Sequence, residues 1–148
     1  MMICFVTGQK PLSMQAVLLK NYKKRLVEEF NNYKHLYQEI PTSENIYSKI
    51  IYIHADSSNL DVDNMSKPFI DAFKGVMYPD DNIINHRTCS KIKMDDYDSY
   101  ELQVDLLPTA VAEKLDELIC NRNSHIVYFE IGLFSTDMVF FGGSRNEA

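Results

Sequence analysis

Residues 61–81 read DVDNMSKPFIDAFKGVMYPDD, a stretch in which crowded acidic residues accompany the pattern of a short helix. The acidic residues are Asp61, Asp63, Asp71, Asp80 and Asp81. Like charges this close repel one another, so we expect the stretch to meet something cationic. Apolar residues at helical spacing, ended by a glycine, predict a helix within residues 64–76. Pro68 fits best in a first turn, so this helix is expected to begin near residues 64–66 or to open irregularly.

Outward from this stretch, the hydrophobic pattern predicts an α+β fold. Apolar residues three or four apart predict further helices at residues 14–37 and 108–120. Short runs of β-branched, aromatic or alternating apolar residues predict strands at residues 3–7, 47–55, 82–94, 100–106, 125–134 and 138–141. The pattern contains no internal repeat, and it places the first acidic pair before the second helix and the last pair after it.

Length and composition fit one globular domain spanning residues 1–148. The chain is 45% hydrophobic and 11% aromatic, which excludes a disordered protein. The N-terminal residues lack the pattern of a secretory signal, and no apolar run is long enough to span a bilayer, so a cytoplasmic protein without membrane contact is expected. Three cysteines, far apart, predict free thiols rather than disulfides or a zinc site.

Charge is unevenly distributed along the chain. The formal net charge is −6, and residues 61–107 hold five Lys or Arg against ten Asp or Glu. This balance argues against indiscriminate binding to nucleic acid, because phosphate contacts require cations. One basic run on the first helix, Lys20, Lys23, Lys24 and Arg25, is either a solvated helix face or the first candidate for contacts with DNA phosphates.

Asp61 and Asp63 form a candidate metal site. If both residues are extended, alternation puts their carboxylates on one side of the chain, with Cα atoms about 7 Å apart. Mg²⁺ takes oxygen ligands and is commonly held by one or two carboxylates together with water and substrate phosphate. A calcium loop that starts at Asp61 fails, because Ser66 stands where glycine is needed and Ala72 where glutamate is needed. The four histidines form no close ligand set.

A composite pattern runs through the same stretch: D-x-D-N-x-x-K-P-x-x-D-A-x-x-G, followed by a closely spaced D-D. It resembles the core of the RusA family of Holliday junction resolvases, which are phage and bacterial endonucleases. The positions that carry the resemblance are Asp61 to Asn64, Lys67-Pro68, Asp71-Ala72, Gly75 and Asp80-Asp81. The combined pattern is moderately specific, whereas D-x-D alone is weak.

The resemblance implies a fold, an activity and a set of site residues. It implies a small mixed sheet packed against helices, with a core of about residues 1–107. The helix and strand pair that the pattern predicts in residues 108–148 extend beyond this core. The resemblance also implies a homodimer that cuts four-way DNA junctions with Mg²⁺ or Mn²⁺. The family's metal acids fall on Asp61, Asp63 and Asp81, its essential lysine on Lys67, and a further basic residue on Lys91.

These residue types suit hydrolysis of a phosphodiester bond. Carboxylates hold a metal that activates water, and Lys67 can neutralise charge that develops on the phosphate. Other interpretations stay open. The acids can be ordinary turn and cap residues, and Lys67 with Asp71 can be an i,i+4 surface pair. The acidic surface also favours a second function, a catalytically weak or inactive RusA-like fold that binds a protein partner, with the C-terminal extension as its contact.

Overall fold

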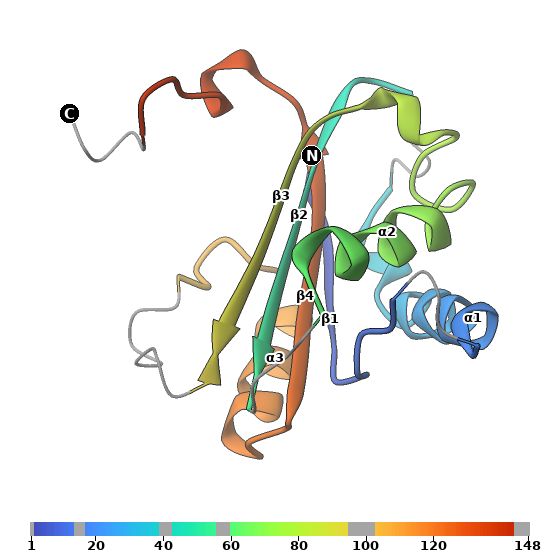
Figure 1. Ribbon diagram of the computed structural model, residues 1–148, viewed down its shortest axis with the longest axis vertical. Coiled ribbons are helices and arrows are strands. Elements are labelled where there is room, and N and C mark those ends of the chain that lie inside the picture. The colour runs from blue at the N-terminus through green and yellow to red at the C-terminus, as the bar shows by residue number, and fades with distance from the viewer. Residues whose placement is uncertain (1, 14–16, 39–42, 56–59, 95–102, 144–148) are drawn as a thin grey trace.

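In the computed structural model, which describes residues 2–13, 17–38, 43–55, 60–94 and 103–143, a four-stranded sheet is combined with three α-helices (Figure 1). The elements in chain order are β1 (Met2–Thr7), α1 (Leu19–Phe30), β2 (Ile46–His54), α2 (Val62–Ala72), β3 (Ile84–Lys93), α3 (Thr109–Cys120) and β4 (His125–Leu133). Short 3₁₀ turns lie at Lys34–Leu36, Asp81–Ile83 and Thr136–Met138. The α+β fold class predicted from the sequence is confirmed.

The sheet is mixed, with the order β1-β4-β2-β3. β4 is antiparallel to both of its neighbours, whereas β2 and β3 are parallel and are joined through α2. The last strand of the chain therefore lies inside the sheet rather than beside it. The expected C-terminal strand pair is wrong in its second member, because residues 136–138 form a 3₁₀ turn and the apolar residues after it stay exposed.

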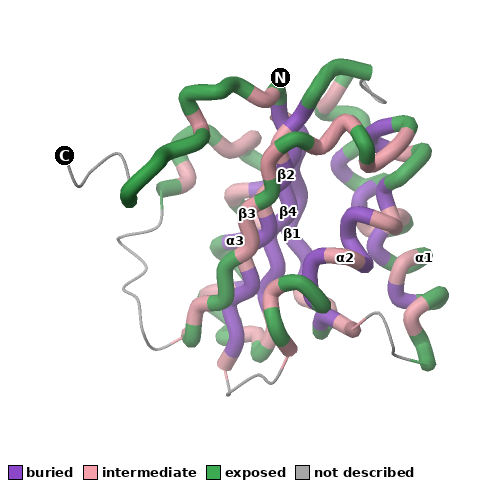
Figure 2. Tube along the Cα trace, turned by 45° about the horizontal axis from the view of Figure 1, so that its top comes forward, coloured by how far each residue is buried: buried purple, intermediate pink, exposed green. Residues whose placement is uncertain are grey.

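One face of the sheet is covered by α1 and α2 through a cluster of aromatic rings. The Phe5 ring of β1 lies 5.5 Å from Phe30 and 5.4 Å from Phe73, between centroids. Phe129 of β4 stacks on Phe73 at 5.3 Å. Burying such rings supplies most of the driving force for folding. Buried segments accordingly follow the strands and the inner sides of the two helices (Figure 2). α3 contacts β1 and β4 from the opposite face.

Helix α2 begins earlier than its proline suggests. Asp61 caps the helix, which starts at Val62, and Pro68 lies inside it with its side chain buried. The interior proline costs one helical hydrogen bond, and the apolar contacts of the buried face offset that loss. The helix ends close to Gly75, as predicted; its φ of +82° is easily reached only without a side chain.

Two further predictions differ from the structure. The long helix expected over residues 14–37 is shorter, because Asn32 and Tyr33 form tighter backbone bonds to Glu29 and Phe30 that end α1; residues 14–16 lie outside the described part. The strand expected at residues 100–106 falls partly on undescribed residues. Its described part is a turn closed by the Leu107 amide and the Val104 carbonyl, 3.1 Å apart, and both side chains pack toward the core.

No helix formed by the described residues combines the length and the apolar character needed to cross a membrane.

Candidate active site

The start of α2 holds the first two acidic residues. Asp61 accepts hydrogen bonds from the Asn64 amide at 2.8 Å and from the Asn64 side chain at 3.2 Å, so it acts as a helix cap. Asp63 lies in the first helical turn and is exposed. The condition that both residues are extended holds for Asp61 but not for Asp63, which is helical. Helical geometry instead sets Asp63 one turn before Lys67, on the same face of α2.

Lys67 lies at the centre of a row of alternating charges. Its Nζ is 3.6 Å from Asp71 Oδ1 and 3.9 Å from Asp81 Oδ2. Asp71 Oδ2 in turn lies 3.8 Å from Lys23 Nζ on α1. We call Lys23, Asp71, Lys67 and Asp81 the charge row. It confirms the i,i+4 pair and connects both helices to the turn before β3. Each exposed pair contributes no more than about 1 kcal/mol, so the row orients Lys67 more than it stabilises the fold.

The two adjacent acids before β3 have different surroundings. Asp80 Oδ1 accepts a hydrogen bond from the Asp81 amide at 2.8 Å and lies 3.3 Å from Lys74 Nζ. The hydrogen bond from Lys74, followed by that from Asp81, lowers the pKa of the Asp80 carboxyl below its ordinary value. Asp80 thus holds the turn, and Asp81 directs its carboxylate toward Lys67.

Strand β3 contributes basic side chains to the same face. Lys91 Nζ donates to the backbone carbonyl of Leu60 at 2.8 Å, directly before α2. Arg87 donates through Nη2 to Ser66 Oγ, which is fully buried and donates in turn to the Asp63 carbonyl at 3.3 Å. Arg87 is not among the site residues predicted from the sequence. The available signal is its spacing of four from Lys91, because residues an even number apart in a strand share a face.

The basic run on α1 separates in the structure. Lys23 is half-buried and joins the charge row, whereas Lys20 and Lys24 are exposed. Arg25 turns toward β1, where its Nε donates to Gln9 Oε1 at 3.2 Å. Lys20 and Lys24 therefore keep the solvent access that a contact with DNA phosphates requires.

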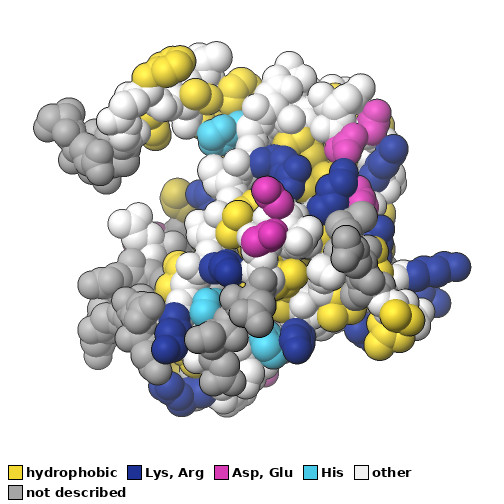
Figure 3. Space-filling model, viewed as in Figure 1, with side chains coloured by type: hydrophobic (Ala, Val, Ile, Leu, Met, Phe, Trp, Pro, Cys, Tyr) yellow, Lys and Arg dark blue, Asp and Glu magenta, His cyan; other side chains and the backbone are white. Residues whose placement is uncertain are grey.

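Dark blue and magenta side chains are interspersed on the face that carries α2 and β3 (Figure 3). Within the described ranges, however, no three side chains of Asp, Glu, His or Cys lie close enough together to hold a metal ion. Asp61 is bonded to Asn64, and Asp81 faces Lys67. The three acids therefore do not surround one point. Asp81 instead pairs with the ammonium group of Lys67. Their chemistry still fits a hard cation, because carboxylate oxygens suit Mg²⁺ and Mn²⁺ and one or two of them suffice.

The fold and this site together define an α+β protein with an acidic, lysine-containing face beside a parallel strand pair. The chain belongs to the RusA family: the family described as Endodeoxyribonuclease RusA matches residues 13–105. The matched range contains all five aspartates of the opening stretch, together with Lys67, Arg87 and Lys91. No curated protein matches the chain. By family, the chain is an endodeoxyribonuclease, which is a hydrolase of phosphodiester bonds. The family also implies the resolution of Holliday junctions.

Proposed function

We propose that this protein is a Mg²⁺-dependent or Mn²⁺-dependent endonuclease that resolves four-way DNA junctions, with the face formed by α2 and β3 as its active site. The position of Lys67 is the observation that carries the proposal. Its side chain lies on the same face of α2 as Asp63, and its Nζ is 3.9 Å from Asp81 Oδ2. A lysine between carboxylates from two different segments suits phosphodiester hydrolysis, because the carboxylates can hold a metal ion and the lysine can stabilise charge on the phosphate.

Asp61, Asp63 and Asp81 would hold the metal ion. A metal ion bound there supplies an activated water and withdraws negative charge from the scissile phosphate. The ligand set requires a modest rearrangement, since Asp81 now faces Lys67 and Asp61 caps α2. The contacts to be exchanged are exposed and individually weak, so the cost of this rearrangement is about 1 kcal/mol for each ion pair broken.

Lys67 neutralises charge on the phosphate oxygens in the transition state. Asp71 is its positioning residue, because it holds Nζ at 3.6 Å while its second oxygen faces Lys23. The N-terminus of α2 adds a partial positive charge close to Asp63. A phosphate that approaches this end of the helix therefore meets a fixed ammonium group and a helix dipole together.

DNA contacts are assigned to exposed cations around the acidic centre. Lys20, Lys24 and Lys91 are the side chains proposed to bind phosphates, with Lys23 and Arg25 contributing from the same helix. The net charge of −6 predicts weak binding. The affinity should also fall as salt rises, because it depends on contacts between these cations and phosphates. A homodimer would present two such faces, which suits the two symmetric cuts that a junction needs.

A catalytically weak protein-interaction module is the second candidate. It is favoured by the exposed apolar segment after β4, where Val139 and Phe140 are nearly half exposed and Phe141 is 99% exposed. Exposed aromatic side chains in succession are typical of surfaces that bind another protein. Under this alternative, the charge row would be a solvated surface and junction DNA would remain uncut.

Cleavage of a synthetic four-way junction separates the two candidates. We expect metal-dependent, paired cuts by the unchanged chain, and a loss of at least about a hundredfold in Asp63→Asn. Asp116→Asn is the matched control, because Asp116 is an exposed acid on α3 and its substitution should leave cleavage unchanged. Absence of metal-dependent cleavage across a range of salt concentrations would overturn the enzyme assignment.

A further inference from the structure

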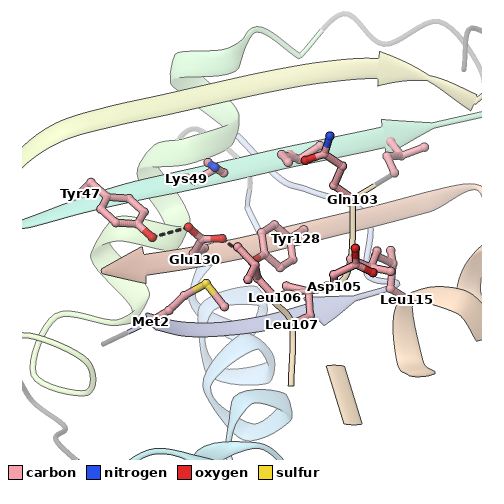
Figure 4. Close-up of a pocket in the computed structure, with 13 residues that line it drawn as sticks. Met2, Tyr47, Lys49, Gln103, Asp105, Leu106, Leu107, Leu115, Tyr128 and Glu130 are labelled. Carbon is pink, nitrogen blue, oxygen red and sulfur yellow. Dashed lines mark hydrogen bonds between the residues drawn. The ribbon is translucent and has the colours of Figure 1, made fainter. Parts of the chain in front are cut away.

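The face of the sheet opposite the charge row contains an open pocket with a volume of about 600 Å³ (Figure 4). Its floor is formed by β2 and β4, and its walls by residues 103–107 and α3. Ile51 and Ile53 of β2 line it, whereas Ile50 and Tyr52 point to the α2 side. This volume falls within the range of small-molecule sites, and the pocket is separate from the proposed nuclease site.

A buried carboxylate lies at one end of the pocket. Glu130 is 7% exposed, and its Oε2 accepts a hydrogen bond from the Tyr47 hydroxyl at 2.5 Å. Its Oε1 accepts one from the Tyr128 hydroxyl, also at 2.5 Å. Gly132 makes the first bond possible, because a Cβ there would come within 2.5 Å of the Tyr47 ring. The carboxylate is therefore held in place by two neutral donors from neighbouring positions of the sheet.

Glu130 has no cationic partner among the described residues. Lys49 is its cross-strand neighbour and lines the same pocket, but no ion pair joins the two side chains within the described ranges. A buried charge without a counter-charge is costly, and hydrogen bonds from neutral hydroxyls offset only part of that cost. Burial, followed by the bond to Glu130, raises the pKa of both Tyr47 and Tyr128, so both phenols stay protonated donors at neutral pH.

Most of the remaining lining is apolar. Leu107, Leu115 and Ile51 are among the apolar side chains that line the pocket, and Met2 lies near Glu130 (Figure 4). These walls favour an organic molecule over a hydrated inorganic ion, because the methyl and methylene groups offer no ligands and gain from contact with a hydrocarbon surface.

We propose that this pocket binds a small organic cation, with a protonated amine at Glu130 and an apolar body against Ile51 and Leu115. The amine supplies the counter-charge that Glu130 lacks. It also donates hydrogen bonds to the lone pairs of the carboxylate that the two phenols leave free. Lys49 competes for the same carboxylate, so it limits the affinity. The site is independent of metal and of DNA.

Binding of 2-phenylethylamine, compared with its neutral analogue 2-phenylethanol, tests this proposal. The experiment uses the full chain, labelled at isoleucine methyl groups, and follows Ile51 and Ile53 by NMR without added metal. We expect saturable shifts with the amine and at least about tenfold weaker binding of the alcohol, since a charge-assisted hydrogen bond is lost. Equal binding of both compounds, or no methyl shift with either at millimolar concentration, would overturn the proposal.

Two variants with opposite expected effects sharpen the test. Glu130→Gln keeps the side-chain shape and should weaken amine binding at least about tenfold. Lys49→Met removes the competing cation and should tighten it. If Glu130→Gln does not fold, Lys49→Met decides: tighter binding of the amine supports the site, and unchanged or weaker binding contradicts it. Junction cleavage is measured separately, so either proposal can fail without the other.

Discussion

Acidic side chains on the two faces of the sheet differ in their exposure and in their partners. On the α2 side, Asp71, Asp80 and Asp81 are partly exposed, and each has a lysine nitrogen at 3.3–3.9 Å. On the α3 side, Glu130 is buried and bonded to two phenols, with no ion pair among the described residues. The first arrangement keeps the charges neutralised in water, where they can exchange partners. The second fixes one charge in place beside an open pocket.

Side chains can exchange contacts at a low free-energy cost only on the α2 side. Exposed ion pairs cost little to break, so the carboxylates on the α2 side can turn toward a metal ion or a phosphate with only a small change in stability. A buried polar network is costly to leave half satisfied, so Glu130 and its two tyrosines should move together or not at all. This contrast supports the proposal of metal-dependent chemistry on the α2 side, where contacts have to change, and the proposal of recognition by a fixed carboxylate on the α3 side.

The largest expected effect is a loss of stability from a change in the aromatic core, which lies apart from both polar sites. Phe129 stacks on Phe73 and contacts Phe5 and Phe69, and it is completely buried. Phe129→Ala should lower the free energy of unfolding by about 3–5 kcal/mol, measured by denaturant titration. Phe141→Ala is the matched control, because this ring is 99% exposed and should change stability by less than about 0.5 kcal/mol. Similar losses in both variants would contradict the assigned core.

The next effect should appear in activity and not in stability. Lys67→Met is expected to reduce junction cleavage at least about a hundredfold, because the charge on the phosphate loses its fixed ammonium group. The free energy of unfolding should change by no more than about 1.5 kcal/mol, because the i,i+4 pair with Asp71 contributes about 0.3–0.5 kcal/mol and the partly exposed pair with Asp81 at most about 1 kcal/mol. Lys74→Met removes a more exposed lysine that pairs with Asp80, and cleavage should persist. Equal loss of cleavage in both variants would remove the special role of Lys67.

A smaller effect, at high pH, involves both faces. Burial raises the pKa of Tyr78 on the α2 side and of Tyr128 in the pocket network. Since both folded pKa values exceed the unfolded one, the stabilisation is complete below about pH 10 and is lost as pH rises further. We expect the free energy of unfolding to fall by up to about 1.4 kcal/mol per pH unit for each such tyrosine.

Denaturant titrations between neutral and strongly alkaline pH measure this slope. Tyr128→Phe removes one titrating group, so its slope above the unfolded tyrosine pKa should be shallower than that of the unchanged chain. An identical slope in the two proteins would show that the pocket phenol does not keep its proton preferentially in the folded state.

Much of the local structure follows from sequence pattern. The spacing of Phe69, Ile70 and Phe73 predicts α2, and Gly75 marks its end correctly. The strand at residues 125–134 is predicted within one residue of β4, but its position between β1 and β2 is not, because pairing order depends on contacts that no local pattern records. The RusA match ends at residue 105, so it also omits this central strand.

The candidate site, too, is only partly predictable from the sequence. The spacing of Asp61 and Asp63 marks them as a candidate pair, and the resemblance to the RusA family adds Lys67 and Asp81; whether the four are the catalytic set stays a prediction. Side chains from distant segments contact the residues next to this set: Lys23 of α1 pairs with Asp71, and Arg87 of β3 donates to Ser66. The pocket on the α3 side is harder to predict from the sequence, because Tyr47 and Glu130 are 83 residues apart and meet only through strand pairing.

The most direct test of the account uses the adjacent pair of acids before β3. Asp80 holds the turn through Lys74 and the Asp81 amide, whereas Asp81 faces Lys67. Junction cleavage with Mg²⁺ should therefore fall at least about a hundredfold in Asp81→Asn and much less in Asp80→Asn, with both variants folded by circular dichroism. Equal cleavage by the two variants, or a greater loss in Asp80→Asn, would contradict the proposed active site.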